Sequence, residues 1–220
     1  MNRRVLAVAM ALLVAACGGS PAPTPSGPTD SPLPAGTHTS TLFQPAVTFT
    51  VPDGWVLDTD SAGYLQLRPA GQSILGIHLF RGVTAASQDP QCPIASQAGI
   101  GTTSSELVAW MRGLKGLVVT SPAMASVGGL VGVSVDVAIA QSWTQSCPFA
   151  NGLPAVPLFV EPGTGLRWVL AGGERLRLYL LDLPGGGTLI VDLDDFGGSQ
   201  FDALVGAAAP IVKSFKFAAS

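Results

Sequence analysis

Apolar and polar residues alternate with a period of two from residue 43 onward. Val47, Phe49 and Val51 alternate with threonines, and a Pro-Asp-Gly turn signal follows at 52–54. Successive side chains of a strand point to opposite faces, so this alternation predicts a strand with one buried face. The pattern recurs twice and predicts an antiparallel meander, with apolar positions at Leu65 and Leu67 and then at Leu75, Ile77 and Leu79.

Two later stretches carry helical spacing instead. Thr103 and Glu106 have the spacing of a capping box, and the apolar residues that follow predict a helix over 104–114. A second helix is expected from a Ser-x-x-Asp cap at 199–202, and Pro210 is expected to bend or interrupt its last turn. The apolar face of this second helix consists of Phe201, Leu204, Val205, Ala208, Ile211 and Val212.

Further strands are expected in the second half, at 117–120, 131–139, 166–171, 174–183 and 188–193. Side-chain parity predicts how the last three strands pair. The leucines of 174–183 share a face with Trp168 only if the loop between the two strands has an odd number of residues, so a three-residue loop at 172–174 is expected. Continuing that face into Leu189 requires a four-residue loop, 184–187. A slip of one residue would turn every leucine to the other face.

Composition agrees with a sheet-rich fold. The 220 residues include 27 Gly and 18 Pro, and charged residues make up 11% of the chain, less than half of the ~25% usual in soluble domains. Many turns and few long helices are therefore expected. The predicted class is α+β: a central antiparallel β-sheet with flanking helices over 43–217, preceded by a signal peptide and a disordered linker.

The first twenty residues are organised as a secretion signal. Arg3 and Arg4 precede an apolar run from Val5 to Val14, which is shorter than the ~20 residues of a membrane-spanning helix. The Val-Ala-Ala-Cys run that follows resembles the lipobox of bacterial lipoproteins. This resemblance implies a signal peptide over 1–16 and a lipid-modified Cys17. The alternative is an ordinary signal peptide with a bystander cysteine.

Six prolines among serine, threonine and glycine predict an unstructured linker over 17–42. Without Arg3 and Arg4 the chain keeps 9 basic against 14 acidic residues, a net charge of -5. This charge gives no electrostatic reason to bind nucleic acid. The expected partners are the membrane, through the lipid at Cys17, and an envelope protein or lipid ligand.

Two cysteines remain beyond the anchor, Cys92 and Cys147, each in a long loop before a proline. In an oxidising compartment we expect them to pair and to pin one loop against the other. Free buried thiols and a metal site are the alternatives. Neither His38 nor His78 stands at a metal-like spacing from either cysteine, and no metal or cofactor is expected.

The runs Val47–Trp55 and Ile211–Phe215, with the meander and helix between them, resemble the PsbP-like fold. Relatives of this fold include lipoproteins of high-GC bacteria, and the resemblance covers roughly Phe43 to Phe217. It implies a central antiparallel sheet with helices packed on it, serving as a binding or assembly module without conserved catalysis. The two cysteine-bearing loops depart from that pattern.

Three arginines and a tyrosine form the first candidate site. The predicted register places Arg175 and Arg177 on the outer face of the sheet, Arg167 opposite Tyr179, and Arg177 near Asp194. Such a face can hold an anionic headgroup or a carboxylate. The alternative is a solvated face whose arginines pair with acids.

The Cys147 loop is the second candidate, because Trp143 and Phe149 make it apolar for a loop. It can line a pocket or present a partner surface, or it can simply cover a sheet edge.

Three further features are interpreted as structural. His78 has no visible nucleophile or acid partner. Asp192 and Asp194 are read as residues of a turn, with Asp195, because a calcium loop would need oxygen ligands where Phe196 and Ala203 stand. No Gly-x-Ser-x-Gly elbow is present.

The leading hypothesis is a non-enzymatic, membrane-anchored envelope lipoprotein that binds a protein partner or an apolar ligand. The alternatives are an enzyme acting on cell-wall or lipid substrates and a structural spacer. A pocket lined by Trp and Phe without titratable groups favours binding, convergent carboxylates favour an enzyme, and the lack of any pocket favours a spacer.

The anchor is tested at its first mature residue. Cys17→Ser removes the thiol that accepts the lipid, so we expect the variant to leave the membrane fraction in a membrane partition assay. A variant that still partitions entirely with membranes at its normal size contradicts lipid anchoring.

Overall fold

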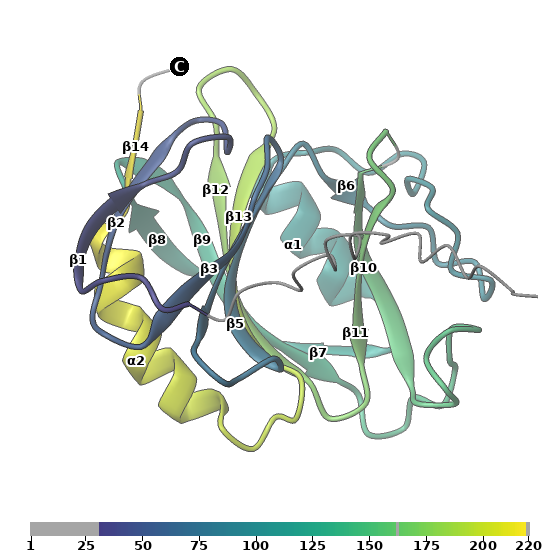
Figure 1. Ribbon diagram of the computed structural model, residues 1–220. Coiled ribbons are helices and arrows are strands. Elements are labelled where there is room, and N and C mark those ends of the chain that lie inside the picture. The colour runs from purple at the N-terminus through teal and green to yellow at the C-terminus, as the bar shows by residue number, and fades with distance from the viewer. Residues whose placement is uncertain (1–30, 162, 219–220) are drawn as a thin grey trace, which may run out of the picture.

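One eight-stranded antiparallel sheet runs through the molecule in the computed structural model, which describes residues 31–161 and 163–218 (Figure 1). Its strand order is β3-β4-β5-β13-β12-β9-β7, and β8 also pairs with β9. The expected α+β class, with a central antiparallel sheet and flanking helices, is confirmed. The strands are β3 (Trp55–Asp60), β4 (Tyr64–Pro69), β5 (Leu75–Arg81), β7 (Leu117–Val119), β8 (Ala123–Val127), β9 (Leu130–Ile139), β12 (Arg175–Asp182) and β13 (Thr188–Asp195).

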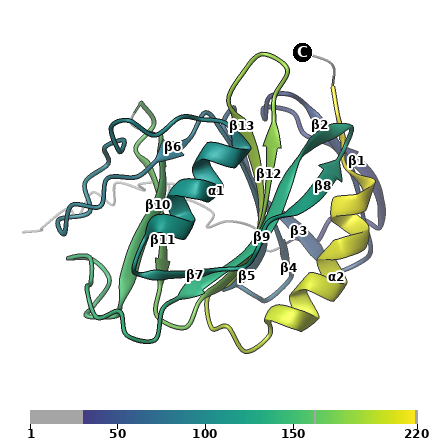
Figure 2. The same cartoon turned by 180° about the vertical axis from the view of Figure 1, so that it is seen from behind.

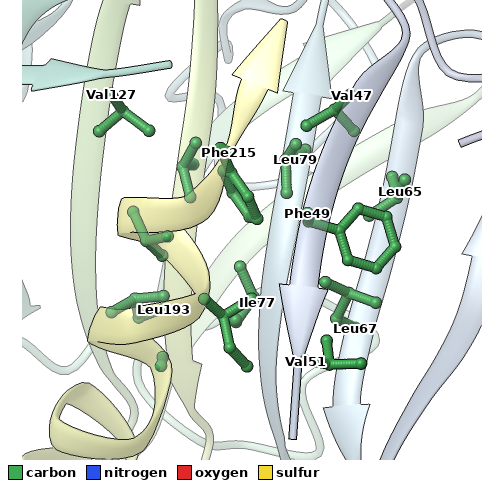
Figure 3. Close-up of a cluster of buried hydrophobic side chains, with 14 of the residues drawn as sticks. Val47, Phe49, Val51, Leu65, Leu67, Ile77, Leu79, Val127, Leu193 and Phe215 are labelled. Carbon is green, nitrogen blue, oxygen red and sulfur yellow. The ribbon is translucent and has the colours of Figure 1, made fainter. Parts of the chain in front are cut away.

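A small sheet and the C-terminal helix cover the first face of this central sheet. β1 (Gly36–Thr39), β2 (Val47–Val51) and β14 (Lys216–Phe217) pair in the order β1-β2-β14, and α2 (Phe201–Ser214) lies beside them. Figure 3 shows the apolar side chains that meet here, including those of Phe49 and Phe215, whose rings pack edge to face. Removing these side chains from water stabilises this half of the fold.

The second face is covered by another small sheet and the first helix (Figure 2). These elements are β6 (Thr84–Ala85), β10 (Ala155–Glu161), β11 (Leu166–Ala171) and α1 (Ser104–Gly113). β5 contributes side chains to the core on both faces of the sheet, since Ile77 and Leu79 pack on the first face and Phe80 on the second. Every residue of β5 from Leu75 to Phe80 is therefore buried.

α1 starts where the sequence predicts. The Thr103 hydroxyl accepts a hydrogen bond from the Glu106 backbone N–H, and the Glu106 carboxylate accepts one from the Thr103 N–H at 3.0 Å. Asp182, at the end of β12, accepts from the Ser104 backbone N–H at 2.7 Å and from its hydroxyl at 2.8 Å. The start of the helix is thereby tied to the central sheet.

The predicted disulfide between Cys92 and Cys147 is confirmed. Both half-cystines are buried and pack with Ala155 of β10. In the loop-entropy model, a bridge across 55 residues constrains the unfolded chain by roughly 4 kcal/mol. It ties two long loops to the β10–β11 layer.

Part of the stretch expected to be linker is a strand, β1. β1 pairs with β2, and the Leu33 N–H donates to the Trp55 carbonyl at 2.7 Å. The expected signal peptide over 1–16, the expected lipid site at Cys17 and the start of the expected linker lie outside the described residues. No helix in the described ranges is long and apolar enough to cross a membrane.

The predicted pairing of the last three strands is wrong in two respects. The loop 172–174 exists, but β11 pairs with β10 and belongs to a different sheet from β12. β12 and β13 pair with Asp182 opposite Thr188, one residue out of the expected register. The observed register is compatible with a buried core because both faces of the central sheet are covered, so the leucines are buried on either face.

The start of α2 also differs from the prediction. The helix begins at Phe201, and its N-cap residue, Gln200, makes no side-chain capping bond. Asp195 instead accepts the Gln200 backbone N–H at 2.6 Å. The helix continues through Pro210 to Ser214.

Close packing between β9 and β12 predicts a stability difference between two glycines. A Cβ at Gly132 would collide with the Leu180 carbonyl oxygen, whereas one at Gly113, at the end of α1, would meet nothing. We expect Gly132→Ala to lower the free energy of unfolding by about 2–3 kcal/mol and Gly113→Ala to leave it equal or higher. Urea unfolding measures both, and equal effects would contradict the strand pairing.

Candidate functional site

A pocket of about 380 Å³ lies on the second face of the central sheet, where β4, β5 and β13 face β11. Three aromatic side chains line it, from Tyr64, Trp168 and Phe196. Its polar lining includes Gln66, His78 and Asp194. The volume falls within the ~300–1,000 Å³ range of small-molecule sites.

His78 stands at the centre of the polar lining. Its Nδ1 lies 2.8 Å from the Tyr64 hydroxyl oxygen, and that hydroxyl donates to Gln66 Oε1 at 3.1 Å. Because the hydroxyl has one proton, we assign the donor role in the first bond to His78 Nδ1–H. His78 Nε2 is then an acceptor, and Asp194 Oδ2, at 3.7 Å, lies beyond hydrogen-bond distance.

Burial keeps the His78 ring neutral. The residue is 4% exposed, and this desolvation lowers the pKa of His78 to about 3. The lack of a side chain at Gly76 leaves room for the ring, since a Cβ there would lie 2.7 Å from His78 Nε2. Trp168 packs across the ring with its centroid 4.6 Å away.

Two buried aspartates stand beside this histidine. Asp192 of β13 lies opposite His78 of the neighbouring strand β5. It is fully buried, and neither of its carboxyl oxygens has a hydrogen-bond partner. Asp194 pairs with Gly76, is 8% exposed, and has no partner for Oδ1. Trp168 Nε1 is close to Asp192 but forms no hydrogen bond of normal geometry.

Burial is the largest cause that raises the pKa of both aspartates, and the charge of Glu174 adds to it. Glu174 lies in the loop before β12, where its Oε2 accepts the Ala171 N–H at 2.7 Å. Burial also raises the pKa of Glu174, to about 7. No lysine or arginine contributes to the pKa shifts of these three groups, so the two aspartates stay protonated at neutral pH.

The remaining acid of β13 has a structural role. Asp195 is buried, and it accepts hydrogen bonds from the backbone N–H groups of Gly197 and Gln200. The turn interpretation therefore fits Asp195 but is wrong for Asp192 and Asp194, which lie inside a strand. Among the residues that the structure describes, no group of three or more His, Cys, Asp or Glu side chains is arranged to hold a metal ion.

The structure does not bring the three candidate arginines together. Arg177 forms a two-bond ion pair with Asp136, with distances of 2.7 and 2.8 Å, on the face away from Asp194. Arg175 stacks on the ring of Phe201, 4.2 Å from its centroid. These pairings match the alternative interpretation, a face of partnered arginines.

Arg167 lies in the other sheet, opposite Val160 rather than Tyr179. Its guanidinium donates to the Cys92 carbonyl at 2.7 Å and stacks 3.8 Å from the centroid of Phe149. Of the four residues, only Arg177 and Tyr179 share a hollow, of about 220 Å³.

The two aromatic candidates of the Cys147 loop also separate. Trp143 packs in the core of the second face and donates its indole N–H to the Ala155 carbonyl at 3.0 Å. Phe149 is half-exposed under the guanidinium of Arg167. Neither residue lines the pocket around His78.

Two other hollows, of about 410 and 540 Å³, lie around Gly63 and Glu161. They are larger, but none of the unpartnered buried polar atoms in the described part of the chain lies in them. The pocket around His78 is therefore the stronger candidate site.

Sequence reasoning missed Asp192, Asp194, Glu174 and the role of His78. A signal was present, since Asp192 and Asp194 interrupt an apolar strand at positions that share a face with Ile190. A buried strand with two acids on one face indicates a polar site rather than a turn.

No protein-family model matches the chain, and no curated protein sequence matches it. The chain is similar in structure to the cyanobacterial PsbP protein CyanoP of Synechocystis, with 12% identity, a TM-score of 0.41, and coverage of 84% of this chain and 94% of CyanoP. It is also similar to a protein of Bacteroides thetaiotaomicron, with 9% identity and a TM-score of 0.36. That match covers 79% of this chain and spans 46% of the Bacteroides protein. Likenesses this weak carry no argument about the site.

The raised pKa values predict how stability depends on pH. Above pH 7 the folded chain keeps the proton of Asp194, whose pKa is raised to about 11, while the unfolded chain has lost it, so unfolding is favoured as pH rises. The pKa of buried Asp192 is shifted in the same direction. Each retained proton lowers the free energy of unfolding by about 1.4 kcal/mol per pH unit. His78 does not contribute there, because it is neutral in both states.

Asp194→Asn removes one of these protons and is expected to flatten the dependence between pH 7 and 9, as measured by urea unfolding. Asp202→Asn is the matched control, since the Asp202 side chain is 91% exposed. Parallel curves for Asp194→Asn and the unaltered chain would contradict a protonated Asp194.

Proposed function

We propose that this chain is a lipid-anchored, extracytoplasmic binding protein of a bacterial envelope, and that the pocket around His78 takes a small ligand. One observation carries the proposal: a buried Asp194 oxygen without a hydrogen-bond partner and the buried ring of His78 line a pocket with aromatic walls. Leaving such groups unpaired costs free energy. A ligand that pairs with them recovers it.

The location rests on the sequence. The signal-like start, the lipobox-like run ending at Cys17 and the proline-rich stretch after it support an anchored domain held away from the bilayer. The disulfide between Cys92 and Cys147 is consistent with an oxidising compartment. A PsbP-like assignment, supported by the Val47–Trp55 run, is part of the same proposal.

An enzyme acting on cell-wall or lipid substrates is the second candidate. The convergence of Asp192, Asp194 and Glu174 beside His78 favours it. The protonation states favour binding instead, because efficient acid–base groups titrate near the working pH. The pKa of His78 is lowered to about 3 and that of Asp194 is raised to about 11, so neither pocket group exchanges protons readily at neutral pH.

The experiment is native mass spectrometry of the full-length protein purified from its own membranes. We expect a bound small molecule in the unaltered chain and its loss in Ser73→Trp, because exposed Ser73 lines the pocket and an indole there fills it.

Ser121→Trp is the matched control, since exposed Ser121 lines the shallow hollow near Arg177 and Tyr179. This variant is expected to keep the ligand. An empty unaltered chain, or equal retention in both variants, would sink the proposal. Turnover of an envelope substrate that Asp194→Asn abolishes would favour the enzyme.

A further inference from the structure

We propose that the ligand of this pocket carries a cationic nitrogen, as an ammonium or amidinium group, on an apolar or aromatic body. This inference rests on the proposed binding function and names the ligand's chemical class. It stands on three observations: the charge of the cluster, the hydrogen-bonding sense of the pocket atoms, and the aromatic walls.

The ionisable groups that shift one another's pKa values beside His78 are all acids. Three carboxyl groups, those of Glu174, Asp192 and Asp194, lie close enough to shift one another's pKa values, and each is buried. Arg68, on neighbouring β4, is paired with Asp58 at 2.8 Å. A cation entering the pocket would meet a site that is acidic and shielded from water, where charge interactions are strong.

Two acceptor atoms of the pocket lack a hydrogen-bond partner, while the buried indole N–H of Trp168 is an unpartnered donor beside Asp192. His78 Nε2 has a free lone pair, because Nδ1 carries the ring proton, and Asp194 Oδ1 is unpartnered. The His78 and Asp194 side chains are 5% and 11% exposed, so water satisfies them poorly. An ammonium or amidinium group has several donors and no acceptor, and it is complementary to this set. A carboxylate or phosphate would instead bring negative charge next to three buried carboxyl groups.

The walls suit a cation as well. The ring of Tyr64 lies 6.0 Å from that of His78 and that of Trp168 lies 4.6 Å from it, both measured between centroids, and both line the pocket. Aromatic faces attract cations through the ring quadrupole. The half-exposed Phe196 at the same pocket offers apolar surface to the rest of the ligand.

Binding of the cation displaces a proton. The empty pocket holds Asp194 protonated, and the incoming charge favours its carboxylate, so one proton leaves as the ligand enters. The groups around Asp194 are His78 from β5, Tyr64 and Gln66 from β4, Trp168 from β11, Glu174 before β12, and Asp192 and Asp195 on its own strand. His78 and Tyr64 keep their protonation states between pH 6 and 8, whereas Glu174, with a pKa of about 7, titrates in this range and can supply part of the released proton. Affinity therefore rises with pH, by about tenfold per unit for one released proton.

The experiment uses three probes of similar size with the purified full-length chain: phenethylammonium, phenethyl alcohol and phenylacetate. Isothermal titration calorimetry at pH 6, 7 and 8, in two buffers of different ionisation enthalpy, gives the affinities and the protons released. We expect phenethylammonium to bind at least about tenfold more tightly than the other two, with a proton released and affinity rising with pH.

Asp194→Asn is expected to lower the affinity for phenethylammonium about tenfold or more and to reduce proton release, while leaving phenethyl alcohol unaffected. Asp202→Asn is the control and should behave as the unaltered chain. Proton release by the unaltered chain tests the inference without any variant.

The outcomes separate the two proposals. If phenethyl alcohol or phenylacetate binds as tightly as phenethylammonium, the pocket binds ligands but the cation inference is overturned. If no probe binds while mass spectrometry finds a native ligand that Ser73→Trp loses, the cation inference fails and the binding function stands. If no probe binds and no native ligand is found, both fail.

Discussion

Both faces of the eight-stranded sheet are covered, and this constraint governs the rest of the molecule. In a sheet with one wet face, a one-residue shift between β12 and β13 would expose a row of leucines. Here α2 with the β1–β2–β14 sheet covers one face, and α1 with the β6–β10–β11 sheet covers the other. Leu189 and Leu193 are therefore buried on one face while Leu176 and Leu178 are buried on the other.

The same register carries two carboxyl groups into the interior. Asp192 and Asp194 alternate with buried apolar residues of β13, so covering both faces buries Asp192 fully and leaves Asp194 in contact only with the pocket. Burying an unpaired carboxyl is costly, and protonation reduces the cost. These buried carboxyl groups thus lower the stability of the fold, which is common at ligand-binding and active sites.

Much of the fold could be predicted because local signals determine it. The Thr103–Glu106 capping box, the alternation in Val47–Val51 and the pairing of the two cysteines all follow from short patterns or from simple arithmetic. The partner of β11, the start of α2 and the β12–β13 register could not be predicted. Each depends on which distant element covers a face, and parity alone gives two answers when both faces are apolar.

By itself the sequence determined the fold class, the positions of most strands and helices, and the disulfide, because backbone propensity, side-chain period and the number of cysteines act locally or leave few choices. Only the tertiary structure decided that His78 faces an acidic pocket, and that Arg167 lies apart from Arg175 and Arg177, which share the ring of Phe201. These outcomes depend on which strands become neighbours, since neighbours decide whether a side chain meets water, an opposite charge or another acid.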